Sequence, residues 1–229
     1  MKPLFLIPIL LFFSSCVKTQ TISNNNKELN FTQVWVWEYK NELKGVEEPG
    51  HHGEMVVYFN PELNYWLFNF ESFGTSGEMF EWVLGKPDGT YIILAKDESG
   101  KSIFWEEKLR FENVKKIPSY YKLMHEKEVF NENDYGYEKL TGKAYQIHYE
   151  KTEEKGKVYL TEYPYDFLPL YYFNQLNLEA KLPIHFPLDL PENSLILKEE
   201  TRTPKGNIQF KLKMISHTEH YIFLNEKFE

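Results

Sequence analysis

Cysteine is nearly absent from this sequence: Cys16 is the only one among 229 residues. Because a disulfide joins two cysteines, none can form within the chain, and no cluster of thiolates can hold a metal ion. The folded chain must therefore take its stability from an apolar core rather than from covalent links.

Positive charge is in deficit as well. The chain has 26 lysines and arginines against 34 aspartates and glutamates, which gives a formal net charge of −8 at pH 7. Nucleic-acid phosphates are bound by clustered Lys and Arg, and anionic lipid head groups by polybasic segments. The composition therefore predicts no nucleic-acid partner, and any attachment to a membrane should depend on acyl chains.

Long apolar runs are missing, with one exception at the N-terminus. Met1-Lys2 is followed by the apolar residues 4–13 and then by Ser14-Ser15-Cys16. The run is too short to span a bilayer, which takes about 20 residues. A short charged start, an apolar stretch and small residues at its end are typical of a secretory signal peptide.

Phe13-Ser14-Ser15-Cys16 resembles the lipobox of bacterial lipoproteins, which usually has leucine where Phe13 stands. The resemblance implies that residues 1–15 are removed and that Cys16 is acylated as the mature N-terminus. Loss of Lys2 without any acid then changes the formal charge from −8 to −9. Val17 follows the cysteine, and in lipoproteins of this kind a residue other than Asp there favours sorting to the outer membrane. An ordinary signal peptide with an incidental cysteine is the alternative.

The remaining chain divides into a tether and one domain. Residues 16–29 are polar, contain three consecutive asparagines and lack apolar periodicity, so we expect a flexible lipidated tether. Residues 30–229 have a length typical of a single domain with one sizeable core.

Short apolar runs separated by turn signals recur along this domain. Antiparallel hairpins are expected because the runs recur about every ten residues, with Pro, Gly, Asn and Asp between them. The expected strands are 33–39, 54–60, 65–71, 78–84, 91–96, 102–107, 143–150, 157–163, 194–201, 207–215 and 220–225, with a turn at 217–220.

Three segments depart from this pattern. Residues 114–131 indicate a short helix or an irregular loop. Residues 165–176 predict a short buried helix, interrupted near Pro169, because almost every face of such a helix would be apolar. Residues 180–192 contain prolines four apart, which favours an extended segment that crosses one end of the sheet.

Several expected strands are apolar on both faces, notably those within 55–59, 65–68 and 91–94. A sheet with one wet face alternates apolar and polar residues, so both faces of these strands must be covered. A long antiparallel sheet also coils through its twist. We therefore predict a mainly β (α+β) fold: a strongly curved antiparallel sheet or half-open barrel with one or two short helices.

With its lipobox, polar tether and about eleven antiparallel strands, the chain resembles the envelope lipoprotein-carrier superfamily. Residues 53–60 (GEMVVYFN) and 188–193 (LDLPEN), the latter followed by two strands, are similar to segments of uncharacterised lipoproteins of this kind. The resemblance implies an unclosed barrel with helices capping its concave side. Carrier members use an arginine to hold that helical lid shut. The only arginines here are Arg110 and Arg202, and neither lies in a sequence context that matches the arginine of the carriers.

No catalytic or metal-binding motif emerges. His51-His52 are adjacent and diverge, whereas His217 and His220 have a spacing suited to a helix but not to a strand. The chain has neither a nucleophile elbow nor a phosphate-binding glycine loop. We expect no enzymatic activity, no metal and no cofactor.

Aromatic residues are abundant, at 17% of the chain. Trp35, Trp37, Trp66, Trp82 and Trp105 fall on four expected strands and are the candidate ligand-binding residues. Three interpretations are open for these tryptophans: they belong to the core, they line an apolar pocket, or they form an exposed platform on which sugar rings stack.

These observations predict a lipid-anchored envelope protein that binds an apolar ligand or acyl chain in a concave sheet face. Its partners would be the membrane, reached through the acyl chains on Cys16, and a hydrophobic small molecule or lipid. A structural or interaction lipoprotein with a filled core and a carbohydrate-binding module are the alternatives. The sequence identifies no protein partner.

Overall fold

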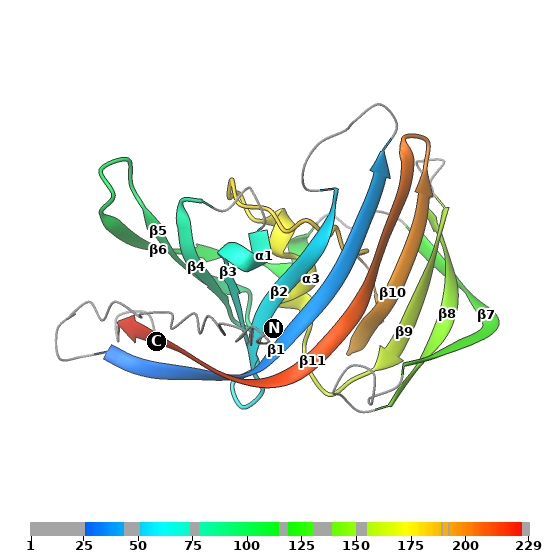
Figure 1. Cartoon of the computed structure of the whole chain (residues 1–229), viewed down its shortest axis with the longest axis horizontal. Coiled ribbons are helices and arrows are strands. Elements are labelled where there is room, and N and C mark those ends of the chain that lie inside the picture. The colour runs from blue at the N-terminus through cyan, green and yellow to red at the C-terminus, as the bar shows by residue number, and fades with distance from the viewer. Residues whose placement is uncertain are drawn as a thin grey trace, which may run out of the picture.

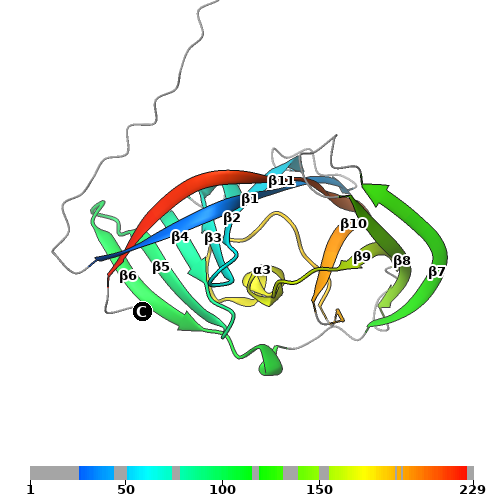
Figure 2. The same ribbon diagram turned by 90° about the horizontal axis from the view of Figure 1, so that it is seen from below.

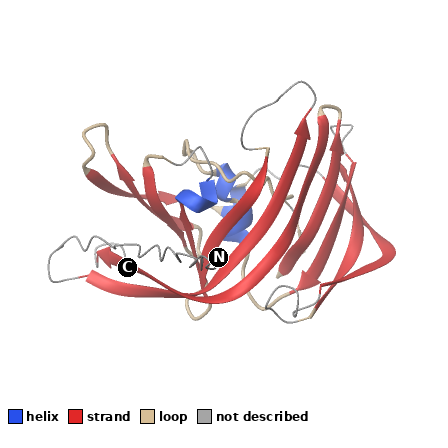
Figure 3. Cartoon of the chain, in the orientation of Figure 1, coloured by secondary structure: helices blue, strands red, loops and turns tan. Residues whose placement is uncertain are grey.

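The computed structural model describes residues 26–43, 51–73, 78–114, 119–130, 139–149, 155–188, 190–191 and 193–225. Within these residues, strands dominate and helices are short (Figure 3). The strands are β1 (Asn26–Leu43), β2 (His52–Asn60), β3 (Tyr65–Asn69), β4 (Phe80–Gly85), β5 (Thr90–Lys96), β6 (Ser102–Lys108), β7 (Ser119–Phe130), β8 (Leu140–Tyr149), β9 (Lys155–Glu162), β10 (Ser194–Thr203) and β11 (Gly206–Asn225). The helical segments are α1 (Phe70–Phe73), η2 (Phe111–Asn113), α3 (Leu168–Tyr171) and η3 (Phe173–Gln175).

All of these strands belong to one antiparallel sheet with the order β6-β5-β4-β3-β2-β1-β11-β10-β9-β8-β7. Each strand pairs with its neighbours in sequence except at one place, between β6 and β7, and the first and last strands pair at the centre. The sheet curves strongly, with β6 and β7 at its two rims and α3 inside the curve (Figures 1 and 2). The predicted fold class, a curved antiparallel sheet with few short helices, is confirmed.

The expectation that both faces are covered is also met. The larger apolar cluster lies on the concave face and includes Trp35, Trp66 and Phe173, all fully buried. A second, smaller cluster contains side chains that point to the other face of the sheet, such as those of Leu67, Ile92 and Leu224. Alternating residues of β3, β4 and β5 thus enter different cores, which explains why their sequences are apolar throughout.

The outer cluster depends on an extension of the two central strands. β2 pairs with β1 only from Gln33 onward, whereas β11 pairs with β1 from Asn26. Residues 26–31 therefore form a two-stranded arm with 220–225, visible beside β4 to β6 in Figure 1. Leu29, Phe31, Ile222 and Leu224 of this arm pack against Leu67, Leu84 and Ile92.

Because of this arm, the folded domain begins earlier in the chain than residue 30, where it was predicted to begin. β1 begins at Asn26, so residues 26–29 belong to the sheet instead of the tether. The remaining tether residues, 16–25, and the signal segment, 1–15, lie outside the described residues. Every strand and both apolar clusters lie between Asn26 and Asn225, so a chain that begins at residue 20 contains all of the described fold.

Two expected elements were wrong. β11 is one strand from Gly206 to Asn225, where two strands and a turn at 217–220 were predicted. Between the pairs Phe31↔His220 and Gln33↔His217, β11 has one more residue than β1, so a β-bulge replaces the turn. β7 is a strand where residues 114–131 suggested a helix or loop. Its own register shift between Leu123 and Lys127 breaks the alternation that marks a strand.

The residues 163–188, here called the plug, fill the concave side. α3 and η3 confirm the short buried helix, but Pro169 lies in the first turn of α3, where proline is tolerated, rather than interrupting it. The following residues are extended, and alternate side chains are buried in the larger cluster: Leu178, Ala180, Leu182, Ile184, Phe186 and Leu188. The proline-rich segment therefore packs along the concave face, and does not merely cross one end of the sheet.

Candidate functional site

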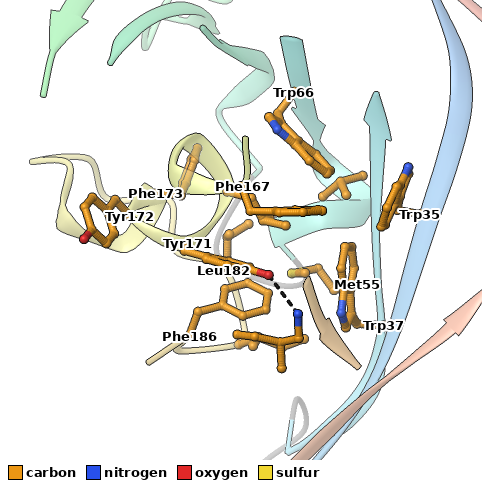
Figure 4. Close-up of a cluster of buried hydrophobic side chains, with 14 of the residues drawn as sticks. Trp35, Trp37, Met55, Trp66, Phe167, Tyr171, Tyr172, Phe173, Leu182 and Phe186 are labelled. Atoms are coloured by element: carbon orange, nitrogen blue, oxygen red, sulfur yellow. Dashed lines mark hydrogen bonds between the residues drawn. The ribbon is translucent and has the colours of Figure 1, made fainter. Parts of the chain in front are cut away.

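The five tryptophans are not gathered at one site. Trp35, Trp37 and Trp66 are fully buried in the larger cluster, on β1 and β3 (Figure 4). Trp105 packs at the edge of that cluster, 6.3 Å from the ring of Phe80. Trp82 faces the opposite side of the sheet, 5.9 Å from the ring of Phe104. The structure thus brings together three of the predicted residues and separates the other two.

Aromatic rings of the plug occupy the space in front of the three buried tryptophans. Phe167 packs against both Trp35 and Trp66, with ring centroids 5.7 and 5.6 Å away. Phe186 meets Trp37 at 6.1 Å, edge to face, as Figure 4 shows. Such ring pairs add to the stability gained by burial. The concave face in front of Trp35, Trp37 and Trp66 is therefore filled by the protein's own side chains.

Hydrogen bonds fix the plug to the sheet at both sides of the curve. Trp66 Nε1 donates to the carbonyl oxygen of Asp166 at 2.9 Å, and the Tyr91 hydroxyl donates to that of Pro169 at 2.8 Å. On the other side, the Tyr171 hydroxyl donates to the Ser194 carbonyl at 2.9 Å and accepts from Ile196 N–H at 3.0 Å. Burial raises the pKa of both tyrosines well above the usual range, so these hydroxyls stay protonated.

Asn174 holds the two halves of the plug together. Its Nδ2 donates to the carbonyl oxygens of Leu182 at 3.1 Å and Ile184 at 3.0 Å, and its Oδ1 accepts from Leu182 N–H at 2.7 Å. One side chain thereby satisfies three backbone groups of the proline-rich segment, which has no strand partner to do so.

A cavity of about 630 Å³ lies on the side of the plug away from the tryptophans. It is formed where α3 meets η2 and the residues Leu190, Pro191, Asn193 and Ser194. The lining residues are Phe111, Glu112, Asp166, Phe167, Leu168, Tyr171, Tyr172, Leu190, Pro191, Asn193 and Ser194. Phe167 forms part of both the core in front of Trp35 and the wall of this cavity. Ligand sites commonly have volumes of about 300–1,000 Å³ and a mostly apolar lining with a few polar groups.

Asp166 is the half-buried acid of this cavity and is held from three sides. Its N–H donates to Asn64 Oδ1 at 3.3 Å, its carbonyl accepts from Trp66, and its Oδ1 accepts from Leu168 N–H at 2.9 Å. Burial raises the pKa of this carboxyl, and the bond from Leu168 N–H opposes the rise. The backbone bonds give the carboxyl a fixed position at the cavity wall.

A second, smaller hollow of about 250 Å³ lies at the ends of β9, β10 and β11. Its charged lining residues are three cations and one acid: Lys155, Lys157, Arg202 and Glu200. Glu200 is paired with Lys198 at 2.9 Å, outside the lining, and charged side chains at strand ends are common on protein surfaces. The larger cavity is therefore the candidate site.

Sequence reasoning selected the tryptophans and missed the residues around the cavity. Two signals in the sequence point to them in retrospect. The segment 165–176 was expected to enter the concave face, and it supplies Asp166, Phe167, Leu168, Tyr171 and Tyr172. The segment 188–193 was noted for its resemblance to other lipoproteins, and part of it forms the opposite wall.

Comparison with protein-family models and with curated proteins found no match to this chain. In the described part of the chain, no group of three or more His, Cys, Asp or Glu residues is arranged to hold a metal ion. A search of the same residues found no helix with the length and hydropathy needed to cross a membrane.

Proposed function

We propose that this chain is a lipid-anchored envelope protein that binds an apolar ligand or an acyl chain without enzymatic chemistry. The observation that carries the proposal is the cavity of about 630 Å³ bordered by α3, η2 and the described residues between Leu190 and Ser194. Cys16 would be the anchor, and the outer membrane of a Gram-negative bacterium the location. The open sheet with a helix on its concave side agrees with the fold that the resemblance to the lipoprotein-carrier superfamily implies.

The lining of the cavity supports an apolar ligand. Seven of its residues, from Phe111 to Pro191, have aromatic or aliphatic side chains: Phe111, Phe167, Leu168, Tyr171, Tyr172, Leu190 and Pro191. Removing apolar ligand surface from water against such walls is favourable by roughly 25 cal/mol per Å². Burial of apolar surface would supply most of the driving force, and binding of this kind needs no reactive group.

The position of the cavity changes where the ligand is expected. Sequence reasoning placed it against the tryptophans of the concave face, and those positions are packed by Phe167 and Phe186. We therefore propose binding on the outer side of the plug, at the gap between the rims of the sheet. No movement of the plug is required.

The filled concave face favours a second candidate, a structural or interaction lipoprotein. In that case the plug completes the core and the cavity stays without a ligand. The carbohydrate-binding alternative required a row of exposed tryptophans, and Trp35, Trp37 and Trp66 are fully buried.

Native mass spectrometry of residues 20–229, purified from cells, distinguishes these candidates. We expect a bound lipid mass that is released on collisional activation, and we expect it to be lost in Leu168→Trp, because the larger ring occupies the cavity. Leu63→Trp is the matched control, since Leu63 is 39% exposed and Leu168 37%, and Leu63 lies outside the cavity lining. A wild-type chain with no bound mass, or a Leu168→Trp chain that keeps it, contradicts the binding proposal.

The anchor has its own test. Radioactive palmitate should label the full chain in cells and should not label Cys16→Ala, because the only thiol is then removed. The unlabelled variant should appear in the soluble envelope fraction, since acyl chains supply the membrane affinity. Equal labelling of the two chains would show that Cys16 is not the acylated residue.

A further inference from the structure

The cavity beside α3 has an uneven charge as well as an apolar lining. Eleven described residues line it, and among them are two acids, Glu112 and Asp166, and no lysine, arginine or histidine. Arg110 precedes Phe111 in the chain but is exposed and outside the lining. Among the described lining residues, a ligand with an anionic head group would therefore meet two carboxylates and no cation.

We infer that the ligand of this cavity is an amphiphile whose head group carries a positively charged nitrogen, an inference that rests on the proposed function. The apolar walls would bury the chain of the amphiphile, and Asp166 and Glu112 would face its cationic head. An alkylammonium group satisfies both conditions, whereas a free fatty acid satisfies only the first.

Aromatic rings in the same wall favour a cation independently of the carboxylates. Phe111 is the partly exposed ring of this wall and meets Tyr172 edge to face at 5.5 Å, whereas Phe167 and Tyr171 are buried and stacked on each other, 5.6 Å apart. All four rings line the cavity. The faces of aromatic rings attract cations within about 6 Å of the ring centroid, and quaternary ammonium groups are recognised in this way.

Asp166 is well suited to be the charged partner. Its backbone is held by Asn64 and Trp66, and among the described hydrogen bonds only its Oδ1 takes part, with Leu168 N–H. Oδ2 is thus able to accept a hydrogen bond from an ammonium group. Burial raises the pKa of this carboxyl, and a bound cation would stabilise its charged form, so the two charges would support each other.

Isothermal titration of residues 20–229 at pH 7.5 with probes of one chain length tests the inference. Decylamine and decyltrimethylammonium, kept below their micellar concentrations, are expected to bind at least about tenfold more tightly than decanol and decanoate. Propylamine tests whether the amine is sufficient, and we expect it to bind far more weakly because it has little apolar surface. Equal binding of propylamine and decylamine would contradict an amphiphile as ligand.

Two variants locate the charge. Asp166→Asn keeps an acceptor for Leu168 N–H and removes the carboxylate, so the affinity for decylamine should fall about tenfold relative to that for decanol. Glu112→Gln should give a smaller loss, since Glu112 is exposed. Glu106→Gln, an exposed acid of β6 outside the lining, is the control for net charge.

The outcomes separate the inference from the proposed function. If decanoate binds the wild-type chain as tightly as decylamine, the cationic head group is wrong and the binding of an apolar ligand stands. If none of the decyl probes binds, both the inference of a cationic head group and the proposed binding of an apolar ligand are contradicted. If decylamine binds but neither Asp166→Asn nor Glu112→Gln weakens it, the carboxylates do not recognise the head group, and the inference is overturned.

Discussion

Replacement of Trp35 by alanine is expected to lower the free energy of unfolding by about 3–5 kcal/mol, the usual cost of removing a large buried aromatic side chain. Trp35 is fully buried, and its ring lies 5.8 Å from that of Trp37 and 5.6 Å from that of Tyr163 in the plug. The substitution would leave a cavity where sheet and plug meet. Urea unfolding of residues 20–229, followed by far-ultraviolet circular dichroism, measures the loss.

Trp82→Ala is the matched comparison, because it removes the same side chain from a partly buried position in the outer cluster. We expect it to cost less than half as much, since fewer contacts are lost. The pair also separates a core role from a ligand role for Trp35. A Trp35→Ala chain as stable as the wild type, but unable to bind lipid, would show that Trp35 lines a ligand site and that the packed core described above is wrong.

Replacement of Gly89 by alanine is expected to cost about 2–4 kcal/mol, from an unfavourable backbone conformation and a steric clash. Gly89 has a φ of 82°, in the left-handed region. A Cβ atom there would come within 3.0 Å of the Leu109 carbonyl oxygen, which is backbone and cannot turn away. Leu109 N–H also donates to the Gly89 carbonyl at 2.8 Å, so relief of the clash would break this bond.

Gly100→Ala separates the two causes. Gly100 has nearly the same φ, 80°, and a Cβ there would have no neighbour within 4 Å. Only the backbone cost remains, so we expect about 1–2 kcal/mol. Urea unfolding of both variants gives the difference. Equal losses of unfolding free energy at the two glycines would mean that the Leu109 carbonyl can move away without cost. The close approach of Gly89 to Leu109 would then be contradicted.

Much of the sheet follows from local sequence. The hairpins β2–β3 and β4–β5 were predicted because turn residues separate short apolar runs, and Gly89 and Asp88 supply the turn chemistry. Burial of both faces was read from runs such as 91–94, where Ile92 and Ile93 enter different clusters. These features depend on residues close in the chain, which single-sequence patterns reveal well.

The elements that were missed depend on register and on distant partners. The strand β7 shifts its pairing with β8 after Leu123, and β11 carries an extra residue opposite β1, so neither keeps the alternation that identifies a strand. Helix α1 follows β3 directly at Phe70, where the sequence predicted that the strand continues. Its Ser72 hydroxyl hydrogen-bonds the Val56 carbonyl of β2, a contact invisible to local patterns.

The candidate site could be predicted only in part. The plug was predicted from its composition. Its docking on the sheet determines which of its side chains face the tryptophans and which face the cavity. Phe167 and Phe186 close the space in front of Trp35 and Trp37, and so move the available volume to the other side of α3. Tertiary packing of this kind cannot be read from periodicity alone.

The pairing of β1 with β11 sets the order in which this chain can fold. Asn26 lies opposite Asn225, so the two middle strands of the sheet come from opposite ends of the sequence. Contacts of such high sequence separation form slowly, because the entropy of closing a long loop must be overcome before they form. During synthesis, the hairpins β2 to β6 and β7 to β10 can assemble early, yet β1 has no β11 partner until Gly206–Asn225 has been made. The two halves of the sheet would therefore be joined late, after the hairpins on either side of β1 and β11 have formed.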